Sequence, residues 1–272
     1  MFMKISDPTA TNVCPEFLVY DRWLAFDNAD VLDLGCGRGE HARAIALSHP
    51  RARVTAVEAD PIQHNLNIAA DVLPNLQFVY GRAEAIPAAD ESIDIVLMFK
   101  SLHHIAVDAL DLDRALLEIR RILRPGGLVY VSEPVFGGEL NEIVRVFHDE
   151  QKVRHDAFAV LRRSVEAGWF QSVEERFFME PVWYADFAHF KQQIVCATHS
   201  NHCLTDSQME DVRQRFVRHL GSEGAYFEAP LRVDLIRKPA DDGQAAAPGD
   251  LGDSIKSTKA ACGLSNQSSR QS

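Results

Sequence analysis

The feature that most constrains the fold is a glycine-rich turn in residues 31–41, between a short apolar strand and a helix. Gly35, Gly37 and Gly39 occupy alternate positions in this turn, directly after the apolar run. Glycine adopts the positive φ that such a turn needs, and it leaves the backbone bare where a ligand can approach. The run therefore predicts a strand–turn–helix unit whose turn binds a ligand.

The glycine spacing and the flanking charges indicate which ligand the turn suits. A dinucleotide fingerprint, G-x-G-x-x-G, would need its third glycine at the position of Glu40. Asp33 and Glu40 flank the turn with carboxylates, which make a poor cradle for a pyrophosphate and a good one for a cation. This pattern points away from NAD and toward S-adenosylmethionine, which carries a sulfonium and an ammonium group.

Strand and helix patterns alternate from residue 30 onward, which predicts βαβ units and a parallel sheet. The expected strands lie at about 31–35, 53–58, 76–80, 93–99 and 128–133. The expected helices lie at about 39–48, 61–72 and 107–123, and the pattern is helical again over 139–167. Segments 173–184 and 225–237 are expected to pair as antiparallel strands, with a helical insertion over 186–221 between them.

A second acidic position lies at the end of the second expected strand. Glu58 closes that apolar run about 20 residues after the glycines, where a carboxylate can accept both ribose hydroxyls. An acid at a strand end can also simply neighbour a helix N-terminus. The distance from the glycine turn favours the ribose role, and it favours Glu58 over Asp60.

Four segments give the chain a resemblance to the class I S-adenosylmethionine-dependent methyltransferases, in the small-molecule branch with the ubiquinone- and sterol-type enzymes. They are residues 33–39, 57–60, 81–96 and 121–127. The resemblance implies an α/β, Rossmann-like fold with a seven-stranded, mostly parallel sheet in the order 3-2-1-4-5-7-6. It also implies helices on both faces, a helical substrate-cap insertion, and S-adenosyl-L-methionine as cofactor.

The resemblance also implies roles for single residues around the cofactor. The backbone of Gly35, Cys36 and Gly37 would approach the methionine part, and Asp33 would orient its ammonium. Glu58 would bind the ribose, with Ala59 against the adenine.

One position departs from the family pattern, because relatives usually have Asp where this chain has Arg82. A guanidinium has no acceptor for the adenine amino group, so Glu84 or the backbone of Ala83 is expected to take that role. Phe99, with Lys100, would line the sulfonium side. Tyr20, in an aromatic helix expected over 17–26, would cover the cofactor or belong to the core.

Three residues are candidates for the chemical step. His103 and His104 follow the fourth strand at the open edge of the sheet, where a histidine can accept a proton as the methyl group moves. Either histidine could instead hold the loop. Glu133 ends the fifth strand and could orient the substrate, accept a proton or satisfy nearby backbone N–H groups. No metal ligands are expected, because the remaining histidines and the five cysteines show no ligand spacing.

The expected function is transfer of a methyl group to O, N or C of a small molecule by in-line displacement. The alternative is an S-adenosylmethionine-binding protein of the same fold with a regulatory or non-methyl-transfer role. A net charge of −11 argues against a nucleic-acid partner, and no apolar run is long enough for a membrane span. A cytoplasmic location is expected, and a homodimer is left open.

The chain is expected to divide into a methyltransferase domain over 1–239 and a tail. Within the domain, residues 1–28 are an N-terminal cap and residues 186–221 the helical insertion. Substrate identity is expected to reside in the cap and in 136–222. The tail, 240–272, is rich in Ala, Gly, Ser, Gln and Asp, which predicts disorder.

Overall fold

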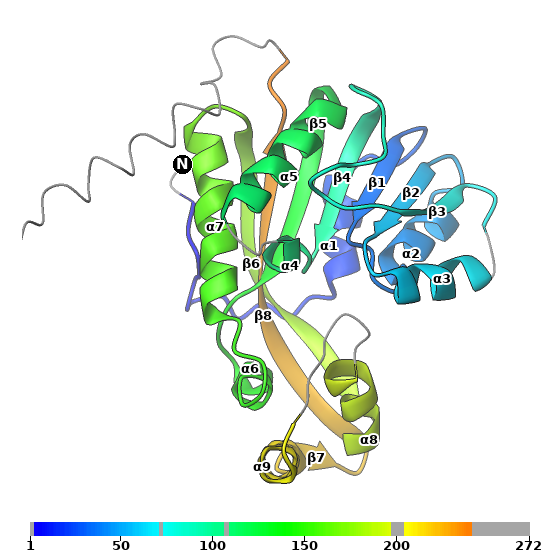
Figure 1. Cartoon of the computed structure of the whole chain (residues 1–272). Helices are drawn as coiled ribbons and strands as arrows, with labels where there is room; N and C mark the ends of the chain where they lie inside the picture. Colours follow the sequence, from blue (N-terminus) through cyan, green and yellow to red (C-terminus); the bar gives the residue numbers. More distant parts are fainter. Residues whose placement is uncertain (1–2, 71–72, 106–108, 197–203, 241–272) are drawn as a thin grey trace, which may run out of the picture.

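Eight strands form one mixed sheet in the computed structural model, which describes residues 3–70, 73–105, 109–196 and 204–240 (Figure 1). The strands are β1 (Asp30–Leu34), β2 (Arg53–Glu58), β3 (Leu76–Tyr80), β4 (Ile93–Phe99), β5 (Leu123–Pro134), β6 (Gln171–Tyr184), β7 (Leu220–Gly221) and β8 (Gly224–Arg237). Their order is β3-β2-β1-β4-β5-β8-β6, and β7 pairs with β8 off this path. The first five strands are parallel, while β8 runs antiparallel to both of its neighbours, β5 and β6.

The predicted order 3-2-1-4-5-7-6 is confirmed for the long strands, with β8 as the seventh of them. The short β7 is an addition that the sequence did not reveal, because two residues carry no alternation pattern.

The helices are α1 (Glu16–Trp23), α2 (Glu40–Ser48), α3 (Pro61–Ala69), α4 (Leu102–Ile105), α5 (Ala109–Ile122), α6 (Glu139–Val144), α7 (Gln151–Glu166), α8 (Phe187–Phe190), the π-helix η1 (Lys191–Val195) and α9 (Asp206–Val217).

Both faces of the sheet are buried, and β1 shows how its side chains divide between them. Leu32 and Leu34 belong to the core cluster that includes residues of α5 and α7. Val31 belongs to the opposite cluster, with residues of α1 and α2. Because side chains alternate along a strand, Asp33 lies on the same face as Val31, under α1 and α2. The alternation thus places one carboxylate inside an apolar layer.

The helical pattern over 139–167 resolves into two helices, α6 and α7, separated by residues 145–150. The break is important for the site, because it brings His148 and Glu150 toward α4, which packs against α7. The start of the expected helix at 107–123 and nearly all of the predicted disordered tail lie outside the described residues. Within the described part of the chain, no helix has the length and apolar character to cross a membrane.

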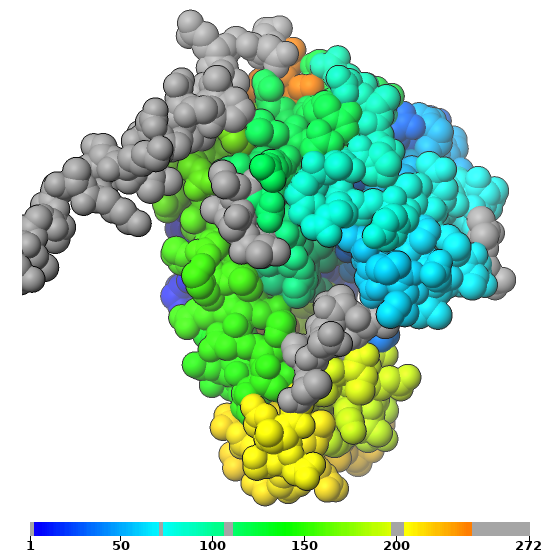
Figure 2. Space-filling model, viewed as in Figure 1, coloured from blue at the N-terminus to red at the C-terminus, as the bar shows by residue number. Residues whose placement is uncertain are grey.

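The antiparallel pair β6 and β8 continues beyond the sheet and carries a separate lobe (Figure 1). The lobe consists of α6, α8, η1, α9, β7 and the outer halves of the two long strands, and Figure 2 shows its yellow segments at one end of the molecule. It has its own apolar cluster, in which Tyr184, Phe190, Phe216 and Phe227 pack together. These aromatic residues thus form the core of this lobe.

Candidate active site

A cavity of about 880 Å³ lies at the carboxyl ends of the parallel strands β1 to β4. This is the edge at which open α/β sheets bind their ligands. Every residue that the sequence predicted to bind the cofactor lines this cavity, except Tyr20. The cavity volume lies within the range of small-molecule sites, about 300–1,000 Å³.

The glycine turn forms one wall of the cavity, and each of its glycines has a different reason to be there. A Cβ on Gly35, whose φ is +73°, would lie 2.8 Å from Cβ of Ser101. At Gly37, φ is +53° and an added Cβ would meet no atom within 4 Å. Gly37 therefore presents bare backbone to open space, as expected of a turn that lets a ligand come close. Gly39 packs its Cα against the ring of Phe78, which a Cβ would meet at 2.5 Å.

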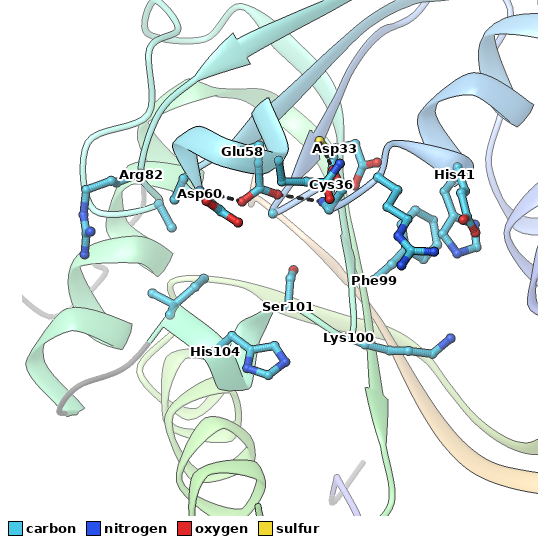
Figure 3. A pocket seen from close by; sticks show the side chains of 18 of the residues that line it. Asp33, Cys36, His41, Glu58, Asp60, Arg82, Phe99, Lys100, Ser101 and His104 are labelled. Carbon is cyan, nitrogen blue, oxygen red and sulfur yellow. Dashed lines mark hydrogen bonds between the residues drawn. The ribbon is translucent and has the colours of Figure 1, made fainter. Parts of the chain in front are cut away.

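Glu58 ties the glycine turn to the end of β2. Its Oε2 accepts a hydrogen bond from the backbone N–H of Gly37 at 2.7 Å, and its Oε1 accepts one from that of Asp60 at 2.8 Å (Figure 3). The side chain is nearly buried yet lines the cavity. Each carboxylate oxygen can accept a second hydrogen bond. Glu58 can therefore hold two loops in place and still receive a pair of hydroxyl groups.

Asp33 is a buried carboxylate whose oxygens have no hydrogen-bond partner among the described residues. Burial is the main reason that its pKa is raised to about 7. The carboxylates of Glu58 and Glu16 raise the pKa further, while the backbone N–H of Ala42, which lies outside normal hydrogen-bond geometry, lowers it only in part. A buried acid that lacks donors and borders a cavity is suited to a cationic ligand.

Aromatic rings form the wall opposite Glu58. The rings of His41 and Phe99 stack with centroids 3.9 Å apart, and both line the cavity. Tyr20 packs edge-on against Phe99 from behind, with centroids 5.3 Å apart, and is itself buried. Burial and the charge of Lys100 lower the pKa of His41 to about 4, so its ring is neutral at physiological pH. Tyr20 supports this wall but does not reach the cavity.

Lys100 borders the cavity but directs its ammonium away from Glu58 and Ser101 (Figure 3). Nζ lies 2.6 Å from Oε2 of Glu180 and 3.3 Å from Oε2 of Glu16. Burial alone would lower the pKa of Lys100, but these two carboxylates outweigh it and raise the pKa to about 12. Lys100 therefore links α1 to β6 as a permanent cation and does not act as a base.

The position that departs from the family pattern forms an ion pair at the edge of the cavity. Nη2 of Arg82 lies 3.0 Å from Oε1 of Glu84, and both residues line the cavity beside Ala83. The Glu84 side chain is largely covered, whereas that of Arg82 is mostly exposed. The Glu84 carboxylate therefore lies at this edge beside the backbone of Ala83, and Arg82 holds its orientation.

Comparison with known proteins agrees with this geometry. Residues 32–131 match the family described as methyltransferase domain. This central part of the chain is therefore similar to a methyltransferase domain. It is 34% identical over 105 residues to a demethylmenaquinone methyltransferase of Chlorobaculum parvum, covering 39% of this chain and 41% of that protein.

Two further proteins resemble this chain, one in sequence and one in fold. A malonyl-acyl-carrier-protein O-methyltransferase of Methylococcus capsulatus is 34% identical over 141 residues, which cover 51% of this chain and 49% of that protein. The chain thus spans less than half the length of the curated relatives it matches. The YcgJ protein of Bacillus subtilis has the same fold, with a TM-score of 0.53 and 16% identity over 82% of this chain and 97% of that one.

The matched methyltransferase family implies S-adenosylmethionine as cofactor, and the cavity residues fit it. Asp33 offers a buried carboxylate without hydrogen-bond donors to an ammonium group. Gly37 leaves open space against bare backbone, and Glu58 keeps acceptor capacity at the end of β2. The fit of the cavity to the cofactor thus rests on the charge of Asp33, the bare backbone of Gly37 and the hydrogen-bonding capacity of Glu58.

The three residues predicted for the chemical step occupy different environments. His104 lines the cavity of the methyltransferase domain, and its side chain is 42% exposed. His103 and Glu133 are buried outside the lining, with Nδ1 of His103 2.5 Å from Oε2 of Glu133. Glu133 Oε1 also accepts a hydrogen bond from the backbone N–H of Leu102. The pair therefore fixes the start of α4, which carries His104.

The sequence analysis missed several residues of the cavity and its surroundings. His41 lies within the glycine-rich run, and its position in the first turn of α2 could have indicated that its ring lines the cavity. Gln193 reaches the cavity from η1, where its Oε1 accepts a hydrogen bond from Arg38. Glu150 contacts both histidines of α4 from the break before α7. Gln193 and Glu150 carry no local pattern, because only the tertiary fold brings them to the site.

Proposed function

We propose that the protein is an S-adenosylmethionine-dependent methyltransferase that transfers a methyl group to O, N or C of a small molecule. The observation that carries the proposal is Asp33, a buried carboxylate without hydrogen-bond donors beside a bare glycine turn. Leaving such a carboxylate unpaired is costly, since burial opposes its charge. A cationic cofactor would relieve that cost on binding.

The residues around the cavity have distinct proposed roles in cofactor binding. Asp33 receives the ammonium, and the backbone of Gly35, Cys36 and Gly37 adjoins the methionine part. Glu58 accepts the ribose hydroxyls with the lone pairs not used by Gly37 and Asp60. The remaining lining residues border the adenine or the sulfonium: Ala59, Ala83, Glu84 and Phe99.

When bound, the cofactor supplies a methyl group already activated by a positively charged sulfur. The protein then has to hold the acceptor in line with that methyl group and exclude water. His104 is the proposed proton acceptor, because its partly exposed ring faces the cavity. Proton transfer by such a group contributes about 10²–10⁴-fold to a rate.

Three other predicted site residues are proposed to act by positioning. His103 and Glu133 form a buried pair that sets the orientation of α4 and hence of His104. Tyr20 supports the stacked rings of Phe99 and His41 from the N-terminal segment. We further propose that residues 1–239 work as one methyltransferase domain, with 1–28 as its cap and 186–221 as the substrate-side insertion.

The acceptor is proposed to be a small molecule, as the names of the curated relatives suggest. It would enter on the side of the cavity lined by Ser101, His104, Ile105 and Gln193, opposite the residues assigned to the cofactor. This side offers one apolar and several polar groups, which fits an acceptor of mixed polarity.

The proposal is tested by calorimetry with S-adenosylmethionine, followed by incubation with methyl-labelled cofactor and a metabolite extract. Binding together with a labelled small molecule is the expected result. Binding without label transfer would overturn methyl transfer and favour a cofactor-binding protein of the same fold. Absence of binding would overturn the cofactor assignment itself.

A variant of Glu58 tests the ribose assignment separately. We expect Glu58→Ala to weaken cofactor binding by about 1–3 kcal/mol, because hydrogen bonds to a charged acceptor are lost. Glu166→Ala, at the exposed end of α7, is the matched control and should bind as the unchanged protein does. Equal affinities for both variants would show that Glu58 does not contact the cofactor.

A further inference from the structure

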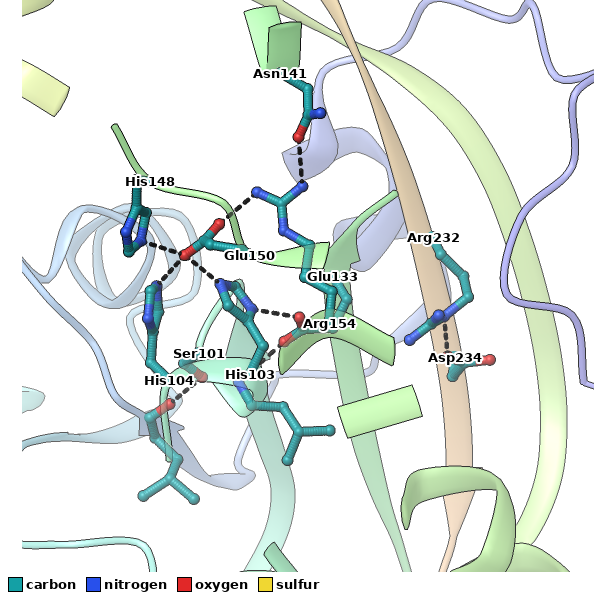
Figure 4. A network of polar contacts seen from close by, with 12 residues as sticks. Ser101, His103, His104, Glu133, Asn141, His148, Glu150, Arg154, Arg232 and Asp234 are labelled. Carbon is teal, nitrogen blue, oxygen red and sulfur yellow. Dashed lines mark hydrogen bonds and ion pairs between the residues drawn. The ribbon is translucent and has the colours of Figure 1, made fainter. Parts of the chain in front are cut away.

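The side chains around Glu150 form a cluster that the proposed cofactor site does not use. Nε2 of His103 lies 3.4 Å from Oε1 of Glu150, and Nε2 of His104 lies 3.8 Å from the same oxygen (Figure 4). Nε2 of His148 approaches that oxygen from another side, at 2.7 Å. Three imidazoles thus converge on one carboxylate oxygen, although they come from α4 and from the segment between α6 and α7.

The spacing of these atoms is also compatible with a metal ion in place of the protons that the imidazoles would otherwise share with Glu150. Ligand atoms of His103, His104 and Glu150 all lie within 4.8 Å of one another. A tetrahedral zinc ion with bonds of about 2.0–2.1 Å holds its ligands about 3.4 Å apart. The distances from Oε1 to the two α4 histidines are 3.4 and 3.8 Å, close to that separation and longer than a hydrogen bond of normal length.

The groups behind the cluster are arranged as in metal sites. Nδ1 of His103 is held by Glu133, which fixes the ring and directs Nε2 toward Glu150. A carboxylate behind a ligating histidine is a recurrent outer partner of protein-bound metals. Arg154 binds the other oxygen of Glu150, Oε2, at 2.5 Å, so Oε1 is the oxygen presented to the imidazoles.

We propose that His103, His104 and Glu150 bind a divalent zinc ion at the acceptor side of the cavity. Two histidines and one glutamate are a ligand set of catalytic zinc sites, in which the fourth position is open. That position would face the cavity, because His104 lines it with a partly exposed ring. Nε2 of His148 lies at hydrogen-bonding distance from Oε1 of Glu150, so His148 supports this carboxylate and is not one of the three ligands.

Zinc binding itself does not depend on the proposed function, whereas its effect on the methyl acceptor rests on that function. A bound zinc ion would turn His104 from a proton acceptor into a ligand. An acceptor hydroxyl in the open position would then ionise more readily, as water does on zinc. Acceptors that present an oxygen to the cavity are therefore the class that such a site would favour.

The test is metal binding to the full chain after removal of bound metal with a chelator. We expect one equivalent of Zn²⁺ per chain, and Co²⁺ in its place should give the visible absorption of a four-coordinate ion with nitrogen and oxygen ligands. His104→Ala and Glu150→Gln should each weaken Zn²⁺ binding at least tenfold. Glu133→Gln should weaken it by about 10–100-fold through the ring of His103.

His155→Ala is the matched control, since His155 lies on α7 with a side chain 68% exposed, and it should bind zinc unchanged. His104 is partly exposed, so its variant tests the site even if the buried substitutions prevent folding. Equal zinc binding by His104→Ala and by the unchanged chain would overturn the proposal. A cobalt–thiolate absorption band would also overturn it, because it would place the ion on a cysteine. Cofactor binding, measured by calorimetry on the same samples, reports separately on the proposed function.

Discussion

At the scale of single residues, Asp33 combines a cost in stability with a role in the site. Its carboxylate lies in the apolar layer under α1 and α2, and neither oxygen has a hydrogen-bond partner among the described residues. Folding therefore raises its pKa from 3.8 to about 7. The folded chain binds a proton more tightly than the unfolded chain, so the free energy of unfolding falls as pH rises from about 4 to 7.

Replacing this carboxylate should separate stability from cofactor binding. We expect Asp33→Asn to raise the free energy of unfolding at pH 8, by at most about 4 kcal/mol for a shift of this size, and to leave it little changed at pH 4. The same variant should bind S-adenosylmethionine at least tenfold more weakly, because the ammonium loses its counter-charge. Denaturant unfolding at both pH values and calorimetry check the two effects. A variant that is less stable at pH 8 would contradict the assignment.

The pH dependence of cofactor binding follows from the same group. Only the ionised form of Asp33 attracts an ammonium, so affinity should fall as pH drops through 7, approaching tenfold per pH unit below it. Calorimetry between pH 5.5 and 7.5 measures this dependence, and Asp33→Asn should show a flatter profile. An equal dependence in the variant would assign the titration to another residue.

At the scale of elements, the strand–turn–helix unit was predictable because its signals are local. The glycines, the strand ends and Glu58 are all read from short windows, and the structure places them around one cavity. For Tyr20 the sequence left both a cofactor contact and a core position open, because an aromatic residue on a helix gives no sign of which side it faces. Gln193 and Glu150 could not be anticipated, since η1 and the break before α7 reach the site only through the tertiary fold.

Gly37 and Gly39, two positions of the glycine turn, should respond differently to the same substitution. Gly39→Ala puts a Cβ 2.5 Å from the Phe78 ring at positive φ, so it should lower the free energy of unfolding by at least about 1 kcal/mol. Gly37→Ala meets no neighbour and should lower stability less, while its Cβ occupies the space against which the cofactor lies. Thermal unfolding and calorimetry on both variants measure the contrast. Equal cofactor affinity in Gly37→Ala and the unchanged chain would contradict this role of Gly37.

At the scale of the whole molecule, the residues that the structure describes form three apolar clusters, two on the faces of the sheet and one in the lobe. The order of the long strands could be expected from the family resemblance and the alternation of elements. The lobe could be expected only as a helical insertion. The core position of Tyr184 and Phe190 in the lobe could not be predicted, because the sequence does not show which residues an aromatic side chain contacts.

The separate cluster predicts that the lobe can lose structure without the sheet. Phe216 is fully buried against Phe190 and Phe227, so Phe216→Ala should cost about 3–5 kcal/mol of local stability. Hydrogen exchange followed by mass spectrometry should show faster exchange in α9 and η1, with β1 and β4 unchanged. Faster exchange throughout the sheet would mean that the lobe and the sheet unfold as one unit.

The ribbon of β6 and β8 also determines the mechanics of access to the cavity. Both strands pass from the sheet into the lobe without a loop between them, paired from Gln171 with Arg237 out to Tyr184 with Ala225. Gln193, held by Arg38, is carried on the far side of that ribbon. A movement of the whole lobe that draws Gln193 away from the glycine turn would therefore bend or twist a paired two-stranded ribbon. The hydrogen bonds of that ribbon oppose such a movement, so the lobe is attached to the sheet more stiffly than a single-chain linker would attach it.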